Sequence, residues 1–121
     1  MRAMSSMSEP IEAGEVDRRT RSSKYALEHA ADAAASCKGR NPEDVVDDAV
    51  RVGDTGSHEV WQLHEALPAG SDARDTASAA YSAAVDGTTA LKAAAVEVED
   101  AEHHYDEAWS HFQRALRTLG W

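Results

Sequence analysis

An apolar residue recurs at every seventh position through the C-terminal half of the chain, and this repeat limits the possible folds more than any other feature. It runs without a gap from Ala77 to Leu119, and in the register three residues later every member except Gly87 is alanine. A strict seven-residue repeat is typical of a helix whose apolar seam faces another helix. Small side chains in the seam let two backbones approach closely. The pattern predicts an all-α protein built on a long, antiparallel, coiled-coil-like helical pair with an alanine-rich seam.

The N-terminal part predicts one helix that begins with a cap signal. Ser8-Glu9-Pro10 combines an N-cap, a proline of the first turn and an acid, so a helix is expected over residues 9–38. Gly39 is expected to end it as a left-handed cap. Residues 1–8, with candidate start methionines at positions 1, 4 and 7, are expected to be a disordered extension of one helical domain over residues 9–121.

Two short helices are expected to follow. Asn41-Pro42 predicts a helix start and gives a helix over residues 42–52, because asparagine caps and proline fits the first helical position. The Gly53 to Gly56 segment is expected to be a turn, after which Ser57 caps a second helix over residues 57–67. Pro68 ends that helix, since it disfavours the helical conformation at the residue before it.

The last helix is expected to be the longest. Ser71 is its N-cap, and Gly87 could break it, but the seven-residue phase continues across that glycine. We therefore expect one helix over residues 72–119, roughly 70 Å long at about 1.5 Å per residue. Antiparallel pairing with the first helix would place Leu27 near Val98 and Val16 near Trp109. The two short helices would complete a three- to four-helix bundle.

Charge and hydropathy narrow the class of partner. A formal net charge of −10 argues against nucleic acid and anionic membranes, because both require a positive patch. The chain has no apolar run of the ~18 residues that a membrane span needs, and no apolar signal core, so a cytoplasmic location is expected. Nine arginines against three lysines, with abundant alanine, indicate a high-GC bacterial source.

The negative charge is concentrated in the C-terminal two thirds. Residues 1–40 carry seven basic and six acidic side chains, whereas residues 41–121 carry five and sixteen. In the antiparallel pair, the basic residues Arg18, Arg19, Arg21 and Lys24 would lie near an acidic face, and such complementarity fixes helix register. The acidic face comprises Glu97, Glu99, Asp100, Glu102, Asp106 and Glu107.

Three histidines within this acidic segment are the best candidates for a metal site. His103, His104 and His111 have carboxylates three or four residues away, as helical metal sites require. A di-iron site would also need a carboxylate-x-x-His pair on a second helix, and the sequence has none. Ion pairs between exposed side chains one helical turn apart explain the pattern better. We therefore expect no metal and keep these three histidines as weak candidates.

No motif indicates catalysis. Gly-x-Ser-x-Gly, Cys-x-x-Cys and Gly-rich phosphate loops are all absent from the sequence. The single cysteine, Cys37, lies at a predicted helix C-terminus, where the helix dipole disfavours a thiolate. We expect neither enzymatic activity nor a cofactor.

The densest group of large apolar residues is at the C-terminus and comprises Trp109, Phe112, Leu116 and Trp121. This group would either pack against the first helix or form a surface for a protein partner, since aromatic side chains dominate binding hot spots. The start of the first helix offers few large apolar residues to cover it, which weakens the case for core packing and leaves both possibilities open. If the group forms a surface, these four residues are the predicted partner-binding site.

In its length, its acidic, alanine-rich composition and its lack of a signal core, the chain resembles the small actinobacterial type VII secretion substrates, which are helical hairpins. The likeness covers length and composition rather than motifs. Those proteins carry Trp-x-Gly between their helices, whereas Trp61 is followed here by Gln62-Leu63. Their tyrosine with an acid four residues later is absent here. The resemblance implies non-classical secretion as an alternative to a cytoplasmic location.

Together these features predict a non-enzymatic protein that acts through protein–protein contacts and self-associates, as a dimer, through its alanine-rich seam and aromatic C-terminal surface. One alternative is an acidic inhibitor or immunity-type protein that occupies a basic site on a partner. Another is a small type VII-secreted helical protein. A metal-binding helical bundle is the least favoured.

Overall fold

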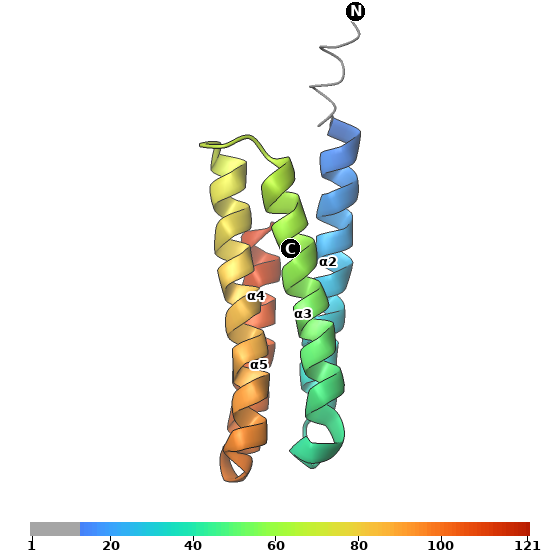
Figure 1. Cartoon of the computed structure of the whole chain (residues 1–121), viewed down its shortest axis with the longest axis vertical. Coiled ribbons are helices and arrows are strands. Elements are labelled where there is room, and N and C mark those ends of the chain that lie inside the picture. Colours follow the sequence, from blue (N-terminus) through green and yellow to red (C-terminus); the bar gives the residue numbers. More distant parts are fainter. Residues whose placement is uncertain (1–12) are drawn as a thin grey trace, which may run out of the picture.

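A computed structural model describes residues 13–121, and within this range the chain is an all-α bundle without strands (Figure 1). The order of elements is α2 (Ala13–Ser36), α3 (Pro42–Ala66), α4 (Asp72–Val96), the 3₁₀ turn η1 (Val98–Asp100) and α5 (Ala101–Thr118). α2 packs on α3, α3 on α4 and α4 on α5, and α5 returns to α2. The predicted helical-bundle class is confirmed. The predicted cap at Ser8 and the extension over residues 1–8 lie outside the described range.

The predicted cap signals act at most helix ends. Asn41 Oδ1 accepts a hydrogen bond of 3.1 Å from the backbone N–H of Glu43, with Pro42 as the first helical residue. Ser71 Oγ accepts one of 3.1 Å from the backbone N–H of Arg74. Gly39, at φ +77°, takes the left-handed conformation expected after α2. The chain therefore reverses between α2 and α3, and between α3 and α4, where the sequence predicted.

The prediction of two short helices over residues 42–52 and 57–67 is wrong, because α3 runs without a break from Pro42 to Ala66. Gly53 and Gly56 lie on its buried face rather than in a turn. A Cβ atom at Gly53 would lie 2.6 Å from Thr88 Oγ1, and one at Gly56 would lie 3.4 Å from Leu27 Cδ2. Ser57, the expected cap, instead donates a hydrogen bond of 3.2 Å to the Gly53 carbonyl. These glycines allow close helix approach.

The single helix predicted over residues 72–119 is also wrong, because the chain reverses at Glu97 and η1, not at Gly87. Leu91 and Tyr105 are both fully buried and lie two heptads apart, so the phase continues across the turn. Val98, between them in the repeat, is 56% exposed. The seven-residue repeat continues through the turn because the number of residues between Leu91 and Tyr105 lets both side chains face the core.

The core forms within one chain. Its largest fully buried side chains include Tyr105, Phe112, Leu27, Leu91 and Val60. The alanines of the seam are buried against the neighbouring helices of the same chain: Ala77, Ala80, Ala84, Ala94, Ala101, Ala108 and Ala115. The alanine-rich register thus brings α4 and α5 into a closed bundle.

The register of α2 against α5 differs from the predicted one. Lys38 Nζ lies 2.7 Å from Asp106 Oδ1, and Lys24 Nζ lies 4.5 Å from the ring centroid of Trp121. These contacts displace α2 along α5 by several helical turns from the expected pairs of Leu27 with Val98 and Val16 with Trp109. The prediction failed because it treated η1 as part of a helix.

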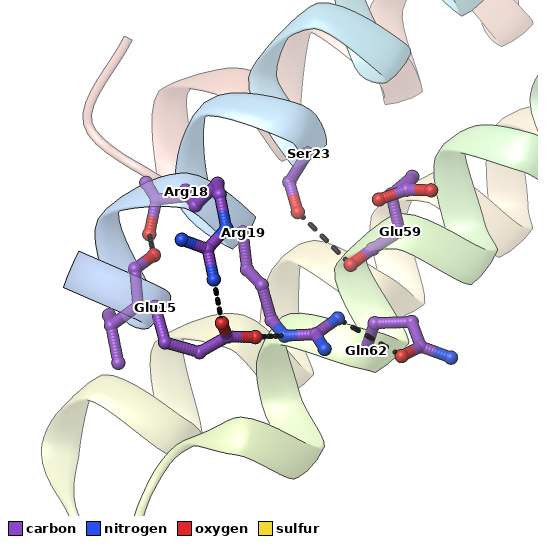
Figure 2. Close-up of polar contacts among 8 residues, drawn as sticks. Glu15, Arg18, Arg19, Ser23, Glu59 and Gln62 are labelled. Atoms are coloured by element: carbon purple, nitrogen blue, oxygen red, sulfur yellow. Dashed lines mark hydrogen bonds and ion pairs between the residues drawn. The ribbon is translucent and has the colours of Figure 1, made fainter. Parts of the chain in front are cut away.

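The basic residues of α2 consequently do not meet the acidic segment. Arg18 and Arg19 pair with Glu15 on their own helix, and Arg19 Nη1 donates a hydrogen bond of 3.1 Å to Gln62 Oε1 on α3 (Figure 2). One turn further along, Ser23 Oγ donates to the Glu59 carbonyl at 3.1 Å. This half of α2 is therefore held against α3.

No helix in the described range is long and apolar enough to cross a membrane.

Candidate functional site

A groove with a volume of about 460 Å³ lies between α3 and α4. About two turns of α3 and three turns of α4 line it with aromatic, hydroxyl and charged side chains. Its lining residues are Asp54, Ser57, His58, Trp61, Tyr81, Val85, Thr88, Thr89 and Lys92. We call this set the α3/α4 groove. Its size is within the range of sites that bind ligands or anchor side chains.

Trp61 is the central apolar residue of the groove. Its ring stacks on His64 at a centroid distance of 4.6 Å and meets Tyr81 at 5.2 Å and a tilt of 52°. These neighbours hold the indole in place, yet Trp61 remains 42% exposed and Val85 on the facing helix 36% exposed. A fixed, exposed aromatic ring loses little conformational freedom on binding, which is the property of a docking anchor.

The polar groups of the groove differ in whether they are free to bind. Ser57 and Thr88 donate their hydroxyl hydrogens to backbone carbonyls one turn earlier in their own helices. His58 Nε2 lies 3.3 Å from Gln62 Nε2. Asp54 and Lys92, in contrast, have no ion-pair partner among residues 13–121. The groove therefore offers an apolar centre with one unpaired charge of each sign.

The sequence predicted a separate short helix over residues 57–67, which includes Trp61, and did not indicate the groove. The missing fact was that α3 continues through Gly53 and Gly56, which sets Trp61 beside α4 instead of in a covering helix. One feature of the sequence could have indicated the α4 wall of the groove: Tyr81 and Val85 lie four residues apart, on one face of a helix, and outside the buried alanine register.

The predicted C-terminal surface is divided between core and exterior. Phe112 is fully buried and Leu116 is 5% exposed, so neither is available on the surface of one chain. Phe112 is enclosed because Gly53 and Gly87 leave room for its ring. Trp109 is 44% exposed, and Trp121 is 39% exposed beneath the Lys24 ammonium. A continuous four-residue aromatic surface therefore does not form.

Most carboxylates of the predicted acidic face already have partners within the chain. Lys38 Nζ lies 2.7 Å from Asp106 and 3.7 Å from Glu102, and these hydrogen bonds raise the pKa of Lys38. Glu102 also accepts a hydrogen bond of 2.7 Å from the backbone N–H of Gly39. Together with the histidine contacts below, these pairs leave only Glu99 and Asp100 of the six without an ion pair in the described range.

His104 bridges two of the remaining carboxylates at the α4–α5 turn. Its Nδ1 lies 2.9 Å from Glu107 Oε1 and its Nε2 lies 2.6 Å from Glu97 Oε1, and its side chain is 13% exposed. Both ring nitrogens face acceptors, an arrangement that suits the imidazolium form. The hydrogen bonds to Glu107 and Glu97 raise the pKa of His104 despite its desolvation, and the pKa of Glu107 falls in turn.

These contacts do not assemble a metal centre. The carboxylates lie on opposite nitrogens of His104, so one ion could not take all three groups. His103 Nε2 lies 3.5 Å from Glu107, and His111 has a buried Nδ1 without a hydrogen-bond partner among the described residues. Within residues 13–121 no group of three His, Cys, Asp or Glu side chains is arranged to hold a metal ion.

Cys37 is buried at the end of α2. Its Sγ donates a hydrogen bond of 3.3 Å to the Ala33 carbonyl, and burial raises the pKa of the thiol. A raised pKa keeps the sulfur in its less reactive thiol form. Its surroundings are those of a small core residue.

No protein-family model matches the chain, and comparison with curated proteins and with solved structures found no match.

Proposed function

We propose that the chain is a non-enzymatic helical interaction protein that self-associates through the α3/α4 groove. The observation that carries this proposal is the exposed indole of Trp61, fixed by His64 and Tyr81 and facing Val85 across the groove. Aromatic anchors of this kind supply a large part of the free energy of protein association.

The groove replaces the alanine-rich seam as the proposed contact. The seam alanines are buried inside one chain, so they have no surface to offer a second copy. Trp109 remains a rival contact because its exposed fraction equals that of Trp61 within a few per cent. An acidic inhibitor has less support, because four of the six carboxylates of the acidic face already contact Lys38 or His104 of the same chain.

The test is light scattering across a dilution series of the wild type and two matched variants. Trp61→Ala should shift the mass from dimer to monomer, whereas Trp109→Ala, which removes an equally exposed indole elsewhere, should leave the dimer intact. Far-UV circular dichroism checks that both variants keep the helical fold. A wild type that stays monomeric at every concentration contradicts self-association. Dissociation by Trp109→Ala alone would transfer the contact to the C-terminal side of the bundle.

A further inference from the structure

Two opposite charges stand on opposite walls of the α3/α4 groove. Asp54 belongs to α3 and Lys92 to α4, both side chains are exposed, and neither has an ion-pair partner among the described residues. A groove that holds one unpaired anion and one unpaired cation is suited to a surface that presents the same two charges in exchanged positions.

We propose that the groove binds a second copy of the chain about a two-fold axis parallel to the helices, so that α3 of each copy faces α4 of the other. This arrangement rests on the proposed function. Rotation about such an axis exchanges the two walls of the groove and keeps their level along the bundle. Because Gly53 lies opposite Thr88, Lys92 of one copy lies about one and a half helical turns further along the bundle than Asp54 of the other, an offset that its long side chain can span. Trp61 of each copy faces Tyr81 of the other. The contact is isologous, so each favourable pair occurs twice.

The charges of the two helices favour this axis over the alternative. α3 carries seven acidic residues and one arginine, whereas α4 carries three acidic residues, one arginine and one lysine. A two-fold axis perpendicular to the helices would pack α3 against α3 and oppose two strongly acidic helices. The parallel axis packs α3 against the nearly balanced α4. Because like charges that face each other across an interface destabilise it, the perpendicular axis is disfavoured relative to the parallel one.

Charge reversal tests the arrangement. Asp54→Lys places two cations at both cross-groove contacts, and Lys92→Asp places two anions there, so each variant alone should dimerise at least about tenfold more weakly than the wild type, a loss of about 1.4 kcal/mol. An equimolar mixture restores both opposite-charge pairs in the heterodimer and should recover the association. Glu28→Lys, an equal change of charge on the exposed side of α2, serves as the control and should leave dimerisation unchanged.

The outcomes separate this inference from the function on which it rests. Two weakened variants that associate when mixed support the cross-groove pairs, since only a contact that joins Asp54 to Lys92 of another copy predicts this recovery. Charge variants that dimerise like the wild type, or a mixture that stays monomeric, overturn the arrangement. If Trp61→Ala still abolishes the dimer in that case, the groove remains the contact and only the axis is wrong. A monomeric wild type would overturn both.

Discussion

Gly87→Ala should destabilise the protein even though alanine is the better helix former. Gly87 lies inside α4, and a Cβ atom there would lie 2.8 Å from both Cε1 and Cζ of Phe112 and 3.0 Å from Cδ1. Carbon atoms pack best at about 3.5–4.0 Å, so the ring would have to move by something on the order of 1 Å. Movement toward α3 is restricted, because the ring also packs closely on Gly53, whose Cβ position lies 3.1 Å from the same Cζ.

The expected loss follows from two opposing terms. Replacing glycine by alanine inside a helix contributes about 1 kcal/mol of stability. Overpacking a filled core costs about 1–3 kcal/mol, and the enclosed ring places this site near the upper end. We therefore expect Gly87→Ala to lower the free energy of unfolding by about 1–2 kcal/mol. Urea unfolding followed by circular dichroism, analysed by linear extrapolation, measures it.

Gly56→Ala is the matched control, because it makes the same chemical change in a buried helix interior. Its Cβ atom would lie 3.4 Å from Leu27 Cδ2 and 3.5 Å from the Ala26 carbonyl oxygen, which is ordinary contact. This variant should gain up to about 1 kcal/mol. A Gly87→Ala variant at least as stable as the wild type would refute the packing argument, as would equal losses at both sites. Phe112→Leu added to Gly87→Ala should cost less than the two separate losses together, because the smaller side chain relieves the clash.

Three further predictions concern the turns at the same end of the bundle. His104→Gln should flatten the pH dependence of stability, because hydrogen bonds to Glu107 and Glu97 raise the pKa of this histidine on folding. The stability that His104 contributes is therefore complete below about pH 6.5 and is lost as the pH rises through the raised pKa. Chemical unfolding at a series of pH values should show this loss of stability in the wild type and in His103→Gln, but not in His104→Gln. Tyr105→Phe removes the hydrogen bond of 3.0 Å to the Arg40 carbonyl and should lower the unfolding free energy by about 1 kcal/mol, with no change in helix content by circular dichroism. Asn41→Ala removes the α3 cap and should cost about 1 kcal/mol in the same assay, whereas Asn41→Ser should restore most of it; equal loss in both would show that the cap does not act.

The helix ends that the sequence predicted well are those with a local chemical cause. Asn41, Ser71 and Gly39 satisfy backbone groups or adopt a left-handed conformation within a few residues of their own position, so composition suffices to find them. Gly53 and Gly56 were misassigned because the same residue type also serves close packing. Only the neighbouring helices decide between the two uses, and those neighbours are distant in sequence.

The α4–α5 turn was missed for a different reason. Val96-Glu97-Val98-Glu99-Asp100 contains neither glycine nor proline, and the seven-residue phase is the same on both sides of it. The turn is held by contacts between residues that are not adjacent in sequence. His104 forms a hydrogen bond with Glu97, and the backbone N–H of Gly39, in the α2–α3 connection, donates one to Glu102. The candidate groove was missed as a consequence, because its two walls become neighbours only when α3 is continuous and α4 is a separate helix.

A core made of alanine and glycine also explains why the aromatic residues are outside it. Closely packed helices leave room for few large rings, and in the described range only Tyr105 and Phe112 among the aromatic residues are fully buried, the latter between two glycines. All three tryptophans are more than one-third exposed. Trp121 lies under the Lys24 ammonium, whereas Trp61 is held in the α3/α4 groove with an unpaired charge on each wall. The close packing that completes the bundle within one chain thus also places its best anchor for a second chain on the surface.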